Sequence, residues 1–228
     1  MWNNYYCFCT VLFSFLVEIE LLFVIVRLFF GENIHMNYRE FKQLLRQEKD
    51  LYFENSSNYY KRLKKSRHKR YYIWRYLYYY RLCQFYHDLR VDNSKNYVQK
   101  KIAKLFFKHY EKKRNIYSYK SGVEIGLNSI IGWNCDIWHS GVVINGVLGE
   151  NCILHGNNVI GNKGIGKENQ LPNIGSNVDI GAGAVIIGDV TIADECIVGA
   201  CSVVTKSFER NSIIAGNPAK FIKFRPKP

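Results

Sequence analysis

The sequence lacks several motifs that would assign it to a common enzyme class. It contains no phosphate-binding Walker loop, no Gly-rich dinucleotide turn and no cluster of metal-type ligands. Its seven cysteines show neither paired nor metal-type spacing, and Cys7 and Cys9 have no second ligand pair nearby. These absences exclude the usual nucleotide and zinc-finger classes, and free cysteines fit a reducing cytoplasm. Four of the thiols are predicted to be small apolar fillers, namely Cys135, Cys152, Cys196 and Cys201.

The first 35 residues lack the basic start and the small-residue cleavage site of a signal peptide. Residues 5–30 are apolar and long enough to span a bilayer, but Glu18, Glu20 and Arg27 would be costly at its centre. Three interpretations remain open: a membrane anchor, a hairpin lying on the membrane, or an upstream extension outside the working protein. The last is favoured, because Met36 begins a stretch typical of a soluble helix.

The second half of the chain lacks an excess of positive charge. Residues 1–120 carry 24 Lys and Arg against 10 Asp and Glu, whereas residues 121–228 carry 8 against 9. The whole excess of the net charge of +13 therefore lies in the first half. This asymmetry predicts two regions with different roles after the leader, a basic one at 36–120 and a nearly neutral one at 121–228.

The neutral region contains a six-residue repeat. Its aliphatic positions keep an unbroken spacing of six from Ile174 to Val204, and also from Ile125 through Ile131 and Ile137 to Val143. After a slip of one residue, Leu148, Leu154 and Ile160 resume the spacing. Neither a helix nor a plain strand has this period, and repeats of six residues are typical of a parallel β-helix. We expect four to five coils of about eighteen residues, with the polar segment 162–173 projecting as a loop.

The basic region is predicted to be helical. An apolar stripe begins at Phe41 and is followed by turn residues at 55–58. A second helix is expected at about 71–89, with its tyrosines near one face. A third is expected at about 96–113, capped by the turn at 91–94. The predicted fold is thus mainly β, a parallel β-helix preceded by an α-helical N-terminal region.

Tyrosines interleaved with lysines and arginines allow three roles for these helices. Such surfaces can bind nucleic acid, but no recognised nucleic-acid module is present. They can also contact an anionic membrane surface or a lipid-linked substrate. Packing and oligomerisation are favoured, because tyrosine buries its ring while its hydroxyl stays in contact with water. We therefore expect no nucleic-acid partner, and a cytoplasmic protein for which contact with the inner membrane face stays open.

Two histidines lie within the repeat, and one of them interrupts its pattern. Trp138 and His139 occupy a corner where small residues are expected, so their side chains must project outward. Glu124 precedes His139 by fifteen residues and can lie on an adjacent coil. A carboxylate that accepts Nδ1–H fixes the imidazole so that Nε2 can deprotonate a hydroxyl. His155 lies about one coil later and either lines the same face or only decorates a turn. No nucleophilic Ser or Cys is needed when a hydroxyl attacks a thioester directly.

Residues 122–224 resemble the hexapeptide-repeat O-acetyltransferases, and among them the serine acetyltransferase-like branch. Beside the hexads, three stretches carry the resemblance: IGAGAV at 180–185, VGACSVVTK at 198–206 and AGNPAK at 215–220. The resemblance implies that the parallel β-helix is left-handed. It also implies an enzyme that uses acetyl-CoA and no metal, built as a homotrimer or a dimer of trimers. It places the catalytic histidine at His139 and its partner carboxylate at Glu124. It also implies that acetyl-CoA lies between subunits, against Ala182, Ala200, Thr205, Lys206 and Lys220, with the two lysines facing its phosphates.

Two departures from the serine-specific pattern bear on the acceptor. Those enzymes have Asp before the catalytic histidine and His before the proline of the projecting loop, where this chain has Trp138 and Leu171. A histidine matching His155 is common in sugar-acting relatives, and Trp138 could stack on a sugar ring. We therefore expect O-acetylation of a saccharide in a surface polysaccharide or its precursor, with Trp138 and His155 binding the acceptor. Serine O-acetylation and a non-catalytic scaffold are the alternatives.

Overall fold

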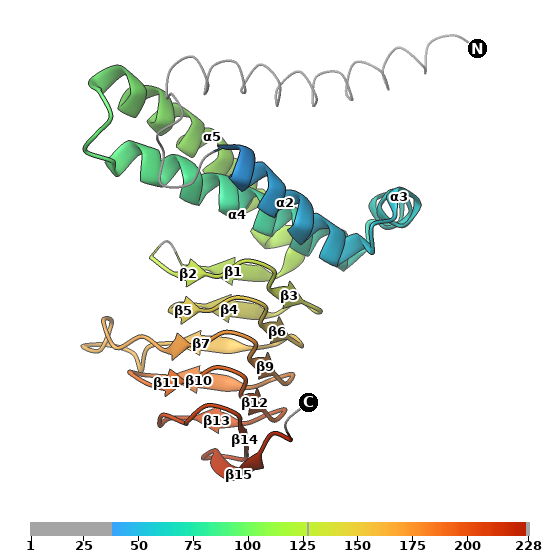
Figure 1. The fold of residues 1–228 in the computed structure, drawn as a ribbon, viewed down its shortest axis with the longest axis vertical. Coiled ribbons are helices and arrows are strands. Elements are labelled where there is room, and N and C mark those ends of the chain that lie inside the picture. The colour runs from blue at the N-terminus through green and yellow to red at the C-terminus, as the bar shows by residue number, and fades with distance from the viewer. Residues whose placement is uncertain (1–37, 127, 227–228) are drawn as a thin grey trace.

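The computed structural model describes residues 38–226 apart from residue 127. Helices occupy one end of an elongated molecule, and a column of stacked coils forms the rest (Figure 1). The predicted leader at 1–35 lies outside the described residues. Among those that are described, no helix is both long enough and apolar enough to cross a bilayer.

Within the part of the chain that the structure describes, four helices form the end region. They are α2 (Tyr38–Phe53), α3 (Ser57–Lys65), α4 (Lys69–Val91) and α5 (Tyr97–Ser121). The turn at 91–94 was predicted to cap α5, but the structure does not have this cap. Asn96 caps the helix instead, in a reciprocal capping box with Gln99. Gly122 ends α5 in the left-handed conformation, with φ of 68°, and leads directly into the first coil.

The tyrosines of α4 lie on two faces of the helix rather than on one. Tyr76 and Tyr80 point at the first coil, where the Tyr76 hydroxyl accepts a hydrogen bond from the Ile125 N–H and the Tyr80 hydroxyl donates to the Ser129 carbonyl. On the other side the ring of Tyr86 stacks on that of Tyr110 in α5 at 5.6 Å. Helix α4 is therefore buried from both sides, and burial raises the pKa of Tyr76 to about 12.

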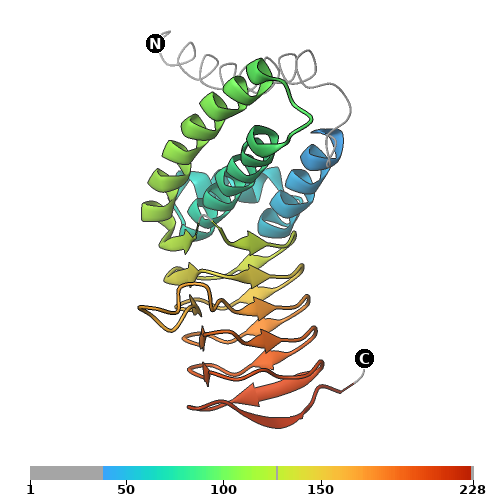
Figure 2. The ribbon, with the colours of Figure 1, turned by 90° about the vertical axis from the view of Figure 1, so that its left-hand side faces the viewer.

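The remaining chain forms a parallel β-helix of five coils, which confirms the predicted fold class (Figure 2). Its three walls are built from short strands that pair with the strands one coil away. Wall A contains β1 (Val123–Ile125), β4 (Val142–Ile144), β7 (Val159–Gly161), β10 (Val185–Ile187) and β13 (Val203–Val204). Wall B contains β2 (Ile130–Ile131), β5 (Val147–Leu148), β8 (Asn173–Ile174) and β11 (Thr191–Ile192). Wall C contains β3 (Asp136–Ile137), β6 (Ile153–Leu154), β9 (Asp179–Ile180), β12 (Ile197–Val198), β14 (Ser212–Ala215) and β15 (Lys220–Phe224).

The aliphatic residue of each hexad points into the column, with one exception. Val143 was expected inside, but its side chain is 41% exposed, and Ile144 takes the interior position at 1%. Ile144 lies seven positions after Ile137 and four before Leu148, so the corner that carries His139 is one residue longer than a hexad and the next corner is two residues shorter. This corner contains one residue more than the corresponding corners below it.

Small residues allow neighbouring coils to approach closely. A Cβ atom added to Gly149 would lie 2.5 Å from the backbone of Gly175, far inside van der Waals contact. Three of the four cysteines that were predicted to be small apolar fillers are buried, namely Cys135, Cys152 and Cys196. Cys201 is different, because it is exposed at a corner with φ of 54°.

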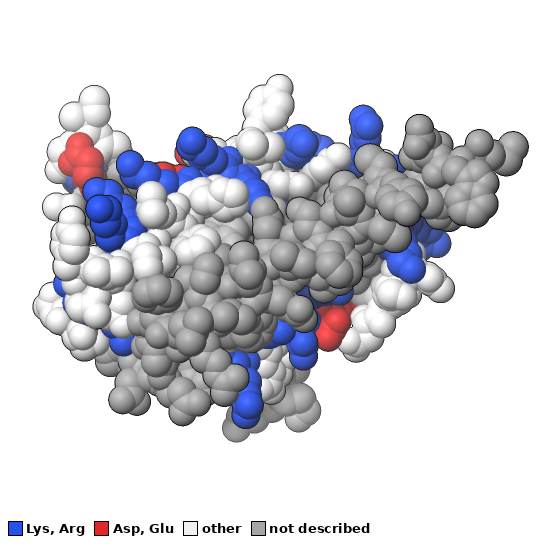
Figure 3. Space-filling view, turned by 90° about the horizontal axis from the view of Figure 1, so that it is seen from above, with Lys and Arg blue, Asp and Glu red and all other residues white. Residues whose placement is uncertain are grey.

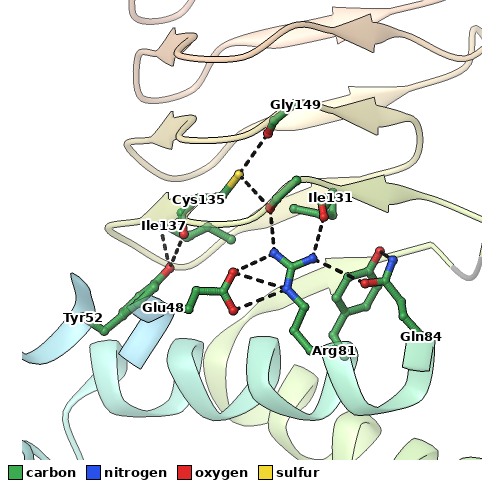
Figure 4. A network of polar contacts seen from close by, with 10 residues as sticks. Glu48, Tyr52, Arg81, Gln84, Ile131, Cys135, Ile137 and Gly149 are labelled. Carbon is green, nitrogen blue, oxygen red and sulfur yellow. Dashed lines mark hydrogen bonds and ion pairs between the residues drawn. The ribbon is translucent and has the colours of Figure 1, made fainter. Parts of the chain in front are cut away.

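Side chains from the helices cap the open rim of the first coil (Figure 4). Arg81 is almost fully buried; it pairs with Glu48 at 2.6 Å and donates hydrogen bonds to the carbonyls of Ile131 and Gly132. The Tyr52 hydroxyl donates to the Cys135 carbonyl and accepts from the Ile137 N–H at 2.8 Å. Backbone groups that would lack a partner at the rim are thereby satisfied.

The projecting segment leaves the column between β7 and β8. Residues 163–170 are exposed, and Ile165 at its tip is fully so. Lys163 packs its side chain over Gly188 of the next coil. At the opposite end of the column, β15 turns back and pairs antiparallel with β14, which closes the last coil.

Candidate active site

His139 lies exposed at the corner where wall C passes into wall A. The extra residue of this corner is accommodated by Gly141, whose φ is 79° and whose N–H donates to the Gly122 carbonyl at 2.7 Å. A Cβ on Gly122 would lie 3.0 Å from that of Ser140, so the junction between α5 and the first coil packs directly on this corner. The helical region thereby fixes the backbone that presents His139.

The same corner in the following coils consists of small residues. The wall C register, Ile137 with Leu154 with Ile180, places Gly156 beneath His139 and Ala182 beneath Gly156. A Cβ on Gly156 would lie 2.6 Å from the Cβ of His139. Ala200 follows one coil further, and both alanines are exposed. We name this line of residues, His139, Gly156, Ala182 and Ala200, the His139 edge.

A buried amide holds the His139 edge together. Asn158 is fully buried; its Nδ2 donates to the Gly181 carbonyl at 2.8 Å, and its Oδ1 accepts from the Gly156 N–H at 2.9 Å. These bonds tie the coil beneath His139 to the next one, so the edge presents a fixed backbone to any ligand lying along it.

Trp138 and His155 lie one position before the His139 edge, at its border with wall C. Their rings are in contact, with 4.3 Å between centroids and an angle of 54° between the ring planes. The Trp138 indole N–H donates to Asp136 at 3.0 Å, and His155 Nε2 lies 2.8 Å from Asp179 Oδ1. The structure therefore brings together the two predicted acceptor-binding residues, each beside a carboxylate.

Glu124 lies on wall A, exposed and in register with Val143. Within the described residues, no hydrogen bond or ion pair joins Glu124 to His139. Its charge does act on a neighbour: burial is the main cause of the raised pKa of Tyr76, the hydrogen bond from the Ile125 N–H and the charge of Arg114 lower that pKa, and the negative charge of Glu124 adds to the rise. The pairing of Glu124 with His139 stays a prediction.

The remaining residues expected to bind acetyl-CoA lie away from the His139 edge. Thr205 and Lys206 are exposed at the carboxyl end of β13, on the corner between walls A and B that also carries the projecting loop. Lys220 begins β15 at the base of the column. In a single chain, the residues predicted to bind acetyl-CoA thus lie in three places. Two of these places are the corners on either side of wall A, and the third is the base of the column.

Two carboxylates of this region, Asp136 and Asp179, were missed in the sequence analysis. Both occupy the outward position of a two-residue strand, and the wall C register places them two coils apart with Ile153 between them. The hexad pattern predicts outward positions, but the projecting loop interrupts the phase before Asp179, so its position beside His155 could not be derived.

Comparisons with known proteins identify the kind of protein that this chain resembles. The pattern of the family described as Bacterial transferase hexapeptide (six repeats) matches residues 172–206. Serine acetyltransferase 4 of Arabidopsis thaliana is 38% identical over 109 residues, which are 48% of this chain and 26% of that protein. Serine acetyltransferase of Buchnera aphidicola is 32% identical over 149 residues, 63% of this chain and 51% of that protein. The chain thus spans between a quarter and half of the length of these relatives.

Solved structures agree on the fold. The structure of Neisseria gonorrhoeae serine acetyltransferase matches with a TM-score of 0.58 at 23% identity, over 84% of this chain and 69% of that one. Serine acetyltransferase of Brucella abortus in complex with coenzyme A matches with a TM-score of 0.56 at 20% identity, over 83% and 70%. The resemblance to the serine acetyltransferase-like branch of the hexapeptide-repeat acyltransferases is confirmed.

The same comparisons correct the expected acceptor. The saccharide acceptor was preferred because of Trp138 and Leu171, but the relatives and solved structures reported above are serine acetyltransferases. The preference for a polysaccharide is therefore wrong. Two substitutions at single positions were given more weight than the similarity of the whole repeat region, and carboxylates close to the substituted Trp138 were not foreseen.

Proposed function

We propose that this chain, a hexapeptide-repeat protein similar to serine acetyltransferases, transfers an acetyl group from acetyl-CoA to the hydroxyl of serine. The observation that carries the proposal is the His139 edge. It offers one exposed imidazole at the end of a line of small residues, with no bulky side chain between His139 and Ala200. Such an edge suits a long, narrow substrate that must bring its thioester to the imidazole.

The residues of the edge suggest a direct transfer. A ring nitrogen of His139 takes the proton of the serine hydroxyl, and the hydroxyl oxygen forms a bond to the thioester carbonyl carbon. The carbon–sulfur bond then breaks, the thiolate of CoA leaves, and it recovers the proton from the imidazole. Glu124 is proposed to orient His139, and the products are O-acetylserine and CoA.

The donor substrate is proposed to use both corners of wall A. Ala182 and Ala200 leave room along the His139 edge, whereas Thr205, Lys206 and Lys220 carry the polar and cationic groups that suit phosphates. Because these sets lie apart in one chain, we propose that acetyl-CoA binds between two copies, in a trimer. A neighbouring copy would then supply the lysines.

The test is an assay of CoA release from acetyl-CoA with serine as the acceptor. His139→Ala removes the base, so kcat/KM should fall by about 10²- to 10⁴-fold. His87→Ala serves as the matched control, because His87 is exposed on α4, away from the edge. A wild-type chain that releases no CoA with serine, or a His139→Ala variant with unchanged activity, contradicts the proposal.

A further inference from the structure

A group of four polar and aromatic side chains lies beside His139 on the outer side of wall C. Its members are Asp136, Trp138, His155 and Asp179. Trp138, His155 and Asp179 make a continuous chain of contacts, at 4.3 Å between the two rings and at 2.8 Å from His155 Nε2 to Asp179 Oδ1. Trp138 is 42% exposed, and the side chains of His155 and Asp179 are 30% and 37% exposed. The group is held in place by its own contacts and is also open to a ligand.

The two carboxylates of the group differ in what neutralises them. Asp136 forms an ion pair with Arg70 at 3.2 Å and also accepts from the Trp138 indole. The side chain of Asp179 has no Lys or Arg partner within the described residues, and its one polar contact there is His155. A negative charge at Asp179 is therefore available to a cationic ligand, whereas that of Asp136 is already compensated.

The other two members of the group also favour a cation. A neutral His155 that donates Nε2–H to Asp179 keeps Nδ1 as a hydrogen-bond acceptor. The indole of Trp138 attracts cations over its face, and its N–H is already engaged with Asp136. In this state the group offers a carboxylate, a lone pair and an aromatic face, and an ammonium group can use all three.

The position of the group relates it to the reacting hydroxyl. Trp138 directly precedes His139, and His155 directly precedes Gly156, which packs against the Cβ of His139. In serine the ammonium and the hydroxyl lie on adjacent carbon atoms. An ammonium held by this group therefore places the hydroxyl toward the imidazole at the corner.

We propose that Asp179, with His155 and Trp138, binds the ammonium group of the amino-acid acceptor. This inference rests on the proposed function. It gives Trp138 and His155 a role with serine in place of the sugar contacts expected from the sequence, and it identifies Asp179 as a residue that determines specificity. A carboxylate one coil below His155 then serves where the serine-specific pattern has an aspartate directly before the histidine.

The experiment measures steady-state kinetics of Asp179→Asn with serine and acetyl-CoA. Loss of a hydrogen bond to a charged group should raise KM for serine roughly tenfold or more, with KM for acetyl-CoA unchanged. Asp179→Glu keeps the charge and should recover most of the affinity. Asp88→Asn, at an exposed position near the end of α4 and away from the His139 edge, is the matched control and should behave like the wild type.

Two inhibitors separate an ammonium subsite from a general structural effect. Alanine carries the ammonium, whereas lactate has a hydroxyl in its place. The competitive inhibition constant of alanine should rise in Asp179→Asn by the same factor as KM for serine, and that of lactate should not rise. An unchanged KM for serine, or an equal loss for alanine and lactate, overturns the subsite. A wild type that does not acetylate serine contradicts the proposed function instead.

Discussion

Cys201 shows that cysteine is used in two ways in the repeat, because it stands three residues before the inward Val204, whereas the buried cysteines stand two residues before theirs. The buried thiols fill space in the column, and burial raises the pKa of Cys196. Cys201 instead turns outward in the left-handed conformation, next to Ala200 on the His139 edge. Its thiol is therefore a chemical probe of the surface on which acetyl-CoA is proposed to lie.

Alkylation of Cys201 by iodoacetamide should be slowed by acetyl-CoA. At about ten times the Kd of acetyl-CoA, the rate should fall roughly tenfold, because most of the protein is then liganded. Peptide mass spectrometry follows the site, and Cys201→Ser identifies its signal. An alkylation rate that does not respond to acetyl-CoA would show that the ligand lies elsewhere.

Individual residues also mark where the sequence was sufficient. The inward aliphatic residues and the corner position of His139 follow from the period of six alone. Val143 was misplaced because one extra residue in the His139 corner shifts the phase, and such an insertion leaves no signal in an aliphatic pattern. The contact of Asp179 with His155 was beyond prediction because it depends on how the loop at 162–171 returns to the column.

At the scale of elements, the helices and the coils are joined by polar contacts as well as by packing. The pair of Arg81 and Glu48 is buried between α2, α4 and the rim of the first coil. Its burial is compensated by the carbonyls of Ile131 and Gly132, which complete the hydrogen bonding of the guanidinium (Figure 4). Removing one member leaves the other charged and buried.

Glu48→Gln should lower the free energy of unfolding by about 3–5 kcal/mol, because Arg81 then lacks its counter-charge. Urea denaturation followed by circular dichroism measures the change. Glu54→Gln, at an exposed position at the end of α2, should alter stability by about 0.5 kcal/mol or less. Equal stability of the two variants would mean that the buried pair contributes nothing to holding the helices on the coils.

The helices also illustrate what periodicity misses. Helix α3 was not predicted, because it is short, it follows turn residues, and Leu63 is its one buried side chain. The tyrosines of α4 were predicted to lie near one face, but they lie on two. A helix that is covered on both sides has no polar face that would reveal its orientation. Helix α5 extends to Ser121, well beyond the expected end at 113, and it ends where Gly122 adopts the left-handed conformation.

At the scale of the whole molecule, the helical end is formed by the described part of the basic half of the sequence. Lys and Arg side chains surround the helical end, among few Asp and Glu (Figure 3). Contact of this end with an anionic membrane surface stays a prediction. The separation of the His139 edge from Thr205 and Lys206 makes a different prediction, since a site shared between copies can be rebuilt from two defective chains.

His139→Ala and Lys206→Glu are each expected to be inactive alone. When the two variants are unfolded and refolded together, mixed trimers should regain roughly a quarter of wild-type activity, because one site in four then joins two intact corners. Variants refolded separately and then mixed provide the control. Absence of recovery after joint refolding would indicate that each chain builds its site alone.

The cap over the first coil has a consequence for how such a protein can change its size. The coils between the rim and the closing strand β15 meet only copies of the same backbone pattern, so the height of the column can grow or shrink there by whole repeats. The uppermost turn has no such freedom, because Tyr52, Tyr76 and Arg81 form hydrogen bonds with particular backbone atoms in it. Variation in length is thus confined to the middle of the column, and the corner that presents His139 stays next to the anchored end.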